Sequence, residues 1–154
     1  SNTNHAVLNG EDVEAEIRTM EVSNHVSEVA TISEVRKKLV EIQQKLGANK
    51  GVVMDGRDIG TVVFPAAELK IFMTASALVR AKRRFEEMIT KGESVTFEAV
   101  LENLEKRDYE DSNRADSPLL QAKDAKVLDN SEINRKQQFE IVLAWAQHEI
   151  QKPR

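Results

Sequence analysis

The residues best suited to bind a ligand or to take part in a reaction lie in one turn, residues 55–61. This turn follows an apolar run at 52–54. The turn contains the carboxylates of Asp55 and Asp58, the guanidinium of Arg57, and two glycines. If the apolar run is a buried strand, the turn lies beyond its carboxyl end, where ligands bind in open α/β sheets. This composition indicates a nucleotide site, although an isolated aspartate after a strand is more commonly a turn-forming residue.

Three further arginines, Arg80, Arg83 and Arg84, are spaced so that they share one face if their segment is helical. Like charges at this spacing repel one another, and an incoming phosphate would convert that repulsion into attraction. The alternative is a solvated face on which Glu86 and Glu87 pair with the arginines. The spacing alone leaves both interpretations open.

A second basic group consists of Arg107 and Arg114, with Asp111 between them. A continuous helix would place all three on one stripe. From spacing alone, a salt-bridge ladder is favoured over a site for a small anion.

The glycines of the chain do not form a phosphate-binding loop. Neither a G-x-x-x-x-G-K-S/T motif nor a G-x-G-x-x-G motif occurs in the sequence. No local element is therefore expected to hold a triphosphate by its backbone amides.

Composition excludes several classes of protein. The chain has 154 residues, of which 40% are hydrophobic and 31% charged, enough for one domain with a real core. The net charge of −4 and an aromatic content of 5% argue against nucleic-acid binding, and the absence of cysteine excludes disulfides and zinc–thiolate sites. Apolar runs fall far short of the ~20 residues that span a bilayer, and no leader peptide is recognisable. We expect a cytoplasmic protein without membrane contacts.

Hydrophobic periodicity predicts the elements that position these residues. Residues 6–10 suggest a strand entering a turn, with a partner strand upstream, and 11–30 suggest a helix in two pieces. Residues 31–34 fit a capping box for a helix that ends at Gly47. Further helices are predicted after caps at 74–76 and at Thr96, and a last helix is expected to bury Phe139, Val142, Leu143, Ala146 and Ile150.

Strands are predicted at 52–54, 69–73 and 126–129. Their alternation with helices predicts an α/β fold, in which a parallel sheet is covered by helices.

Several separated motifs together resemble bacterial cytidylate kinase, also called CMP/dCMP kinase. They lie at residues 17–22, 55–65, 80–84, 106–108 and 113–115, in the order and at the spacing found in that family. The resemblance implies a three-layer P-loop nucleoside monophosphate kinase fold, here incomplete because the family's first strand and phosphate loop are absent. It further implies a single-domain fragment at 1–154, divided into a CMP-binding segment (1–50), an α/β core (51–76 and 115–154) and a lid (77–114).

The family transfers the γ-phosphoryl group of ATP, with Mg²⁺, to CMP or dCMP, which gives CDP or dCDP and ADP. The resemblance assigns CMP binding to Ser27, Arg36, Arg57, Asp58, Arg107, Asp111 and Arg114. It assigns catalytic roles in phosphoryl transfer to Arg57, Arg114, Arg80, Arg83 and Arg84, and it places Asp55 near Mg²⁺ through water. Carboxylate and guanidinium groups match the donor and acceptor pattern of cytosine, and uracil reverses that pattern.

Two hypotheses follow for this chain. One is a cytidylate kinase fragment that keeps the CMP site but cannot turn over ATP alone. The other is a noncatalytic nucleotide-binding or protein-interaction domain derived from the same fold. The resemblance implies a monomeric full-length enzyme. A fragment without the central strand would have an open slot between 52–54 and 69–73, through which we expect it to self-associate.

Overall fold

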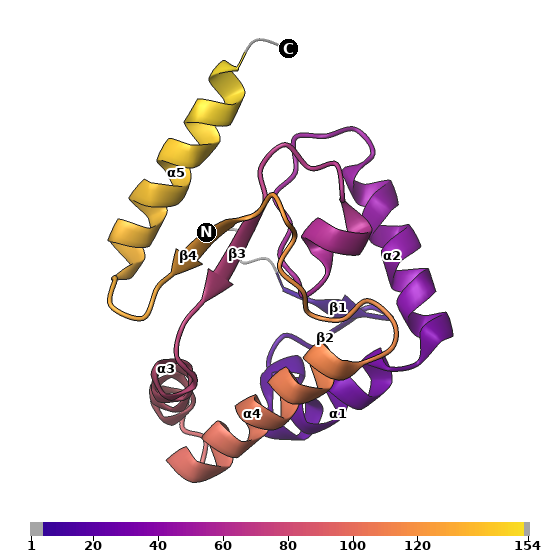
Figure 1. Cartoon of the computed structure of the whole chain (residues 1–154). Helices are drawn as coiled ribbons and strands as arrows, with labels where there is room; N and C mark the ends of the chain where they lie inside the picture. The colour runs from indigo at the N-terminus through magenta and orange to yellow at the C-terminus, as the bar shows by residue number, and fades with distance from the viewer. Residues whose placement is uncertain (1–4, 153–154) are drawn as a thin grey trace.

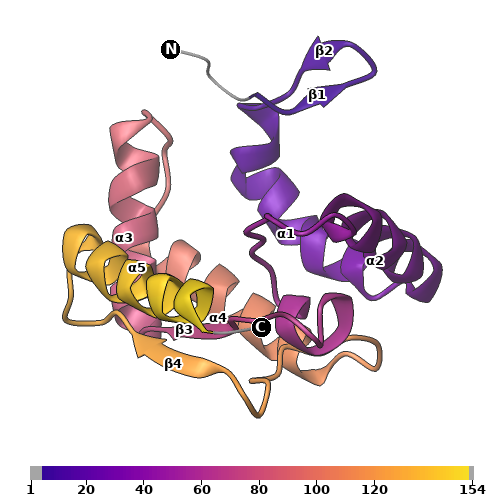
Figure 2. The ribbon, with the colours of Figure 1, turned by 90° about the horizontal axis from the view of Figure 1, so that it is seen from above.

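The computed structural model describes residues 5–152 of the chain, except for the side chain of Ser27. Two groups of elements are visible: α1 and α2 with a small hairpin on one side, and a short sheet with α3, α4 and α5 on the other (Figures 1 and 2). In chain order the elements are β1 (Val7–Leu8), β2 (Glu11–Asp12), η1 (Glu16–Arg18), α1 (Met20–Ala30), α2 (Ser33–Gly47), η2 (Ile59–Val63), β3 (Ile71–Thr74), α3 (Ala77–Thr90), α4 (Phe97–Asn113), β4 (Lys126–Asp129) and α5 (Arg135–Gln151).

The sheet consists of β3 and β4, which run parallel with Ile71 opposite Lys126 and Thr74 opposite Asp129. β4 has the predicted bounds, whereas β3 begins two residues after its predicted start. The α/β architecture with a parallel sheet is thus confirmed, in a two-stranded form among the described residues.

The strand predicted at 52–54 is wrong. Residues 51–55 have no regular secondary structure, and the side chain of Val53 is fully exposed. A β-strand needs a neighbour to satisfy its backbone donors and acceptors. Within residues 5–152 no strand lies beside this segment, so its apolar residues remain in an irregular extended stretch.

The N-terminal region corrects two further expectations. β1 pairs with β2, which lies downstream, across a turn in which Asn9 and Gly10 both have positive φ. Because residues 11–12 form β2, the helical region predicted to start at residue 11 starts only at Glu16, with η1, and continues as α1 from Met20. The predicted capping box at 31–34 is also absent, since Ile32 caps α2 without a side-chain bond and the hydroxyl of Thr31 donates instead to the carbonyl oxygen of Glu28.

The best-packed part of the molecule is the pair α3 and α4. Both helices have the predicted caps, because the hydroxyls of Ser76 and Thr96 accept backbone N–H groups of their first turns. The rings of Phe85 and Phe97 meet edge to face at 6.0 Å. The buried apolar side chains are those of Val63, Ala81, Met88, Val100 and Leu128.

α5 follows β4 and has the weakest apolar packing. Asn134 and Gln137 form a reciprocal capping box at its start, and the ammonium of Lys126 lies 5.3 Å from the ring centre of Trp145. Contrary to the prediction, Phe139 and Ile150 are 63% and 81% exposed, and Leu143 is exposed as well. Strands of 4 residues are too short to cover a helix of 17 residues, because a strand rises about 3.3 Å per residue and a helix about 1.5 Å.

In the described part of the chain, none of the helices combines the length and the apolar character needed to cross a bilayer.

Candidate nucleotide site

The turn predicted to carry the site is held by η2. The carbonyl oxygen of Asp58 accepts the backbone N–H groups of Thr61, Val62 and Val63, so the turn closes tightly behind this residue. Asp58 itself is only 4% exposed. A buried carboxylate requires compensation by hydrogen bonds or a counter-charge.

That compensation comes from α2. Nη2 of Arg36 donates to Oδ2 of Asp58, and both side chains are largely buried. Nε of Arg36 is buried and has no hydrogen-bond partner among the described residues. This donor is therefore unsatisfied within the described structure, which is unfavourable unless a ligand or a water supplies an acceptor.

Asp111 on α4 joins two arginines from distant parts of the chain. Its Oδ2 accepts from Nε of Arg57 at 3.0 Å, and its Oδ1 accepts from Nη1 of Arg114 at 3.0 Å. Nε of Arg114 donates to the carbonyl oxygen of Ser117 at 2.7 Å, whereas its Nη2 is buried without a partner among the described residues. Burial lowers the pKa of Arg114, and the nearby charge of Arg36 lowers it further.

Arg107 lies one turn before Asp111 but does not pair with it directly. Its Nη1 donates to the hydroxyl of Ser23 on α1 at 3.0 Å, and its Nε is a third buried donor without a partner in the described structure. Burial lowers the pKa of Arg107, followed by the positive charge of Arg57. The predicted salt-bridge ladder is thus present only between Asp111 and Arg114.

We refer to these six side chains as the arginine cluster: Arg36, Arg57, Arg107, Arg114, Asp58 and Asp111. Four positive and two negative charges leave a surplus of two positive charges, 4 − 2. The like charges oppose one another, and three guanidinium donors lack partners within the described residues. Such a cluster favours a phosphorylated ligand, because arginines bind phosphate oxygens by strong charge-assisted hydrogen bonds.

The arginines of α3 lie outside this cluster and do not form an uncompensated face. Arg80 donates to both carboxylate oxygens of Asp108, at 3.1 and 2.6 Å, and its pKa is raised chiefly by that hydrogen bonding. Arg83 donates to the side chain and the carbonyl oxygen of Asn130. Arg84 pairs with Glu87, as the solvated alternative expected.

Two of these arginines nevertheless line a hollow at the carboxyl ends of β3 and β4. It has a volume of about 330 Å³, and its walls include Thr74, Arg80, Arg83, Asp108 and Asn130. This is the position at which ligands bind in parallel sheets.

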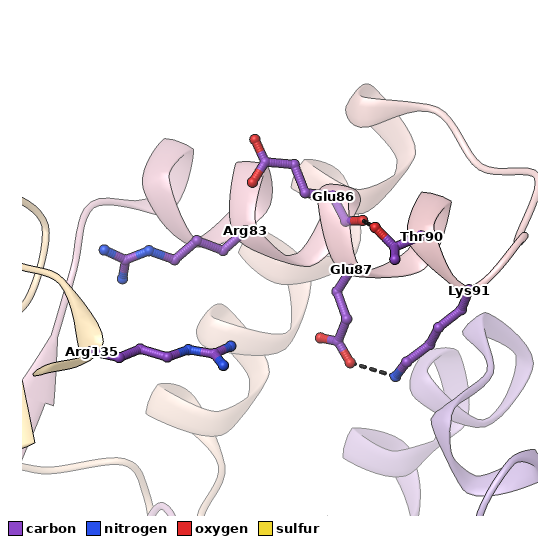
Figure 3. Close-up of a pocket in the computed structure, with 6 residues that line it drawn as sticks. All are labelled: Arg83, Glu86, Glu87, Thr90, Lys91 and Arg135. Carbon is purple, nitrogen blue, oxygen red and sulfur yellow. Dashed lines mark hydrogen bonds and ion pairs between the residues drawn. The ribbon is translucent and has the colours of Figure 1, made fainter.

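A second hollow lies on another part of α3 and near the start of α5 (Figure 3). Cations and carboxylates are mixed there, and Glu87 pairs with Lys91 at 2.6 Å. Mixed charge of this kind offers little to a phosphate.

Besides the arginines of α3, two predicted site residues are not placed in the cluster. Asp55 is exposed and belongs to the irregular segment before the turn. No group of three His, Cys, Asp or Glu residues that could hold a metal ion is found in the described part of the chain. Ser27 belongs to α1, but its side chain lies outside what the structure describes.

Comparison with known proteins decides the family. A sequence model of the family described as cytidylate kinase matches residues 1–148. The chain belongs to the cytidylate kinase family. It is 64% identical over 136 residues to a cytidylate kinase of Flavobacterium johnsoniae, with 88% of this chain and 59% of that protein covered. It is 52% identical over 143 residues to a cytidylate kinase of Bacteroides fragilis, with 93% of this chain and 62% of that protein covered.

The chain spans about three fifths of the length of these cytidylate kinases. Membership of the family supports the α/β fold of P-loop nucleoside monophosphate kinases, of which the parallel β3–β4 pair is a part.

Sequence reasoning missed several polar partners within this cytidylate kinase fold. Ser23 and Asn130 contact arginines that are 84 and 47 residues away along the chain, and Asp108 contacts Arg80 across 28 residues. Helical spacing detects only partners three or four residues apart, so no local signal pointed to these contacts.

Proposed function

We propose that this chain carries the acceptor-nucleotide site of a cytidylate kinase, which transfers the γ-phosphoryl group of ATP to CMP or dCMP. The products would be CDP or dCDP and ADP. The observation that supports this most strongly is the arginine cluster: a buried carboxylate at a tight turn, surrounded by guanidinium groups with unpaired donors. Phosphoryl transfer depends mainly on positioning and on neutralising charge, for which arginines are suited.

Asp58 and Arg36 are proposed to recognise the base. Cytosine presents an amino donor next to ring and carbonyl acceptors. The carboxylate of Asp58 would accept from the amine, and the unpaired Nε of Arg36 would donate to an acceptor. Ser27 would add a further contact. Uracil has a carbonyl where cytosine has the amine, so it would place an acceptor against the carboxylate of Asp58 and bind weakly.

The remaining cluster residues are proposed to hold the sugar and the phosphate. Arg57 and Arg114 would clamp the acceptor phosphate, since Asp111 already orients both guanidinium groups. Arg107 and Asp111 would contact the sugar and the neighbouring phosphate. The surplus positive charge of the cluster would be neutralised by the phosphate.

The donor side is proposed to involve α3. The segment 77–114 would act as a lid over the CMP-binding segment (1–50) and the core (51–76 and 115–154). Arg80, Arg83 and Arg84 would then exchange their present partners for phosphate oxygens and exclude water from the site.

Mg²⁺ would enter with ATP as a co-substrate complex and would neutralise charge on the transferring phosphates. The single exposed carboxylate of Asp55 fits a metal that keeps most of its water and phosphate ligands, and it would contact that metal through water.

The second candidate function is a noncatalytic nucleotide-binding or protein-interaction domain. It is favoured by one observation: Arg80, Arg83 and Arg84 pair with protein groups instead of being left free for a phosphate donor. A noncatalytic nucleotide-binding domain would also bind nucleotides, whereas a protein-interaction domain need not. We expect selectivity for an acceptor pyrimidine from the first function.

Calorimetric titration with CMP, with UMP and AMP as controls and without ATP, tests the proposal. We expect selective binding of CMP. A folded chain that binds none of the three, or all three equally, would contradict the assignment of the acceptor site.

A further inference from the structure

A hydrogen-bonded chain of polar side chains links α1 to α4 behind Arg107. Nη1 of Arg107 donates to the hydroxyl oxygen of Ser23 at 3.0 Å, and this hydroxyl donates to Oδ1 of Asn103 at 3.1 Å. Nδ2 of Asn103 in turn donates to Oδ1 of Asn24 at 2.7 Å. Each group in this series of hydrogen bonds donates to the next one, from Arg107 to Asn24, so the hydroxyl of Ser23 has a fixed orientation.

Arg107 needs such a support. Its guanidinium is half-buried and lies near the charges of Arg57 and Arg84, which disfavour its charged form, and its Nε has no partner among the described residues. Nη1–Ser23 is the hydrogen bond that orients it, and a serine hydroxyl can accept only if its own hydrogen points elsewhere. Asn103 supplies the acceptor that directs this hydrogen away from Arg107.

From this geometry we propose that Ser23 and Asn103 are positioning residues, which hold the Arg107 guanidinium in the orientation that receives the nucleotide. The proposal rests on the acceptor site described above. Neither residue contacts the nucleotide; both act through Arg107. Because Ser23 lies on α1 and Asn103 on α4, the same bonds also fix the CMP-binding segment against the helix that carries Asp111.

The test uses Ser23→Ala and Asn103→Ala, with Thr31→Ala and Asn113→Ala as matched controls. Thr31 and Asn113 each donate a hydrogen bond to a carbonyl oxygen of their own helix, to Glu28 and to Tyr109 respectively, without contact to Arg107. We expect CMP to bind about three- to tenfold more weakly to the Ser23 and Asn103 variants, the size of one ordinary hydrogen bond, because both residues act on the ligand only through Arg107. The controls should bind CMP as the parent chain does.

A double-mutant cycle with Arg107→Ala distinguishes an effect of Ser23 that passes through Arg107 from a general structural role of Ser23. If Ser23 acts through Arg107, Ser23→Ala has no further effect on CMP binding once Arg107 is removed. An equal loss in both backgrounds, or no loss in either, would overturn the proposal.

A measurement without ligand keeps this proposal distinct from the proposed function. Side-chain ¹⁵N NMR should show hindered rotation of the Arg107 guanidinium in the parent chain and faster rotation in Ser23→Ala. If the parent chain binds no CMP, the proposed function fails, and the rotation alone then decides whether Ser23 positions Arg107. Unchanged rotation in Ser23→Ala would refute the positioning role.

Discussion

The charge of Asp58 is the feature of the site whose removal has the most specific expected result. Asp58→Asn keeps the shape of the side chain and one oxygen acceptor, but it leaves the Arg36 guanidinium without its counter-ion. Complete removal of one partner from a buried pair costs about 3–5 kcal/mol of folding free energy. Because the amide still accepts a hydrogen bond, we expect the free energy of unfolding to fall by about 1–3 kcal/mol.

The effect on ligands should be selective. A hydrogen bond to a neutral acceptor is roughly half as strong as one to a carboxylate. CMP should therefore bind about tenfold more weakly, a loss of about 1.4 kcal/mol in the free energy of binding. The amide can also donate to the carbonyl of uracil, so the preference for CMP over UMP should narrow further. Inorganic phosphate should bind as before, because Arg57 and Arg114 are oriented by Asp111 rather than by Asp58.

Calorimetry with CMP, UMP and phosphate, together with urea unfolding, measures these quantities. Asp124→Asn is the matched control, since Asp124 is an exposed carboxylate that pairs with Lys70 away from the cluster. The reasoning is wrong, and Asp58 does not recognise the base, in either of two cases. In the first, Asp58→Asn binds CMP and UMP with the parent affinities. In the second, its affinity for inorganic phosphate falls as much as its affinity for CMP.

Three other predictions concern the phosphate, the core and the open sheet. Arg114→Ala should weaken the binding of CMP by about tenfold or more and leave the binding of cytidine nearly unchanged, because cytidine has no phosphate for Arg114 to hold. Equal losses of affinity for CMP and cytidine in calorimetry would contradict this. Met88→Ala should lower the free energy of unfolding by about 2–5 kcal/mol, since Met88 is 0% exposed. Met73→Ala, at a residue 51% exposed, should cost clearly less in the same urea titration. In light scattering, we expect the mean mass of the chain to rise with concentration as it self-associates. Val53→Lys should reduce this self-association, because a charge in an unpaired segment opposes strand pairing. A chain that is monomeric at every concentration would contradict the open slot.

The elements that the sequence predicted correctly are those with local causes. α3 and α4 begin where Ser76 and Thr96 cap them, and the capping bonds involve residues only three positions apart. β4 has its predicted bounds because it pairs with β3 over its whole length. The apolar run at 52–54 carries an equally good local signal, but a strand also requires a neighbour, and sequence periodicity does not report one.

The candidate site was predictable in its residue types but not in its connections. The turn at 55–61 and the arginines were recognised from their chemistry and from their resemblance to a family. Their partners were not, since Arg36–Asp58 and Arg57–Asp111 join residues 22 and 54 positions apart. Long-range ion pairs follow from how helices pack, which is decided by the whole core rather than by any local pattern.

The parallel pairing of β3 with β4 has a consequence for the order in which the chain folds. Ile71 and Lys126 are 55 positions apart, 126 − 71, and α3 and α4 lie between them. Closing so long a loop is entropically costly while the intervening chain is disordered, and contacts of high sequence separation form slowly. The α3–α4 helical hairpin is local and contains the best-buried side chains, so it is expected to form first and to shorten the effective loop. Substitutions such as Met88→Ala should therefore slow refolding, whereas changes in β4 should mainly accelerate unfolding.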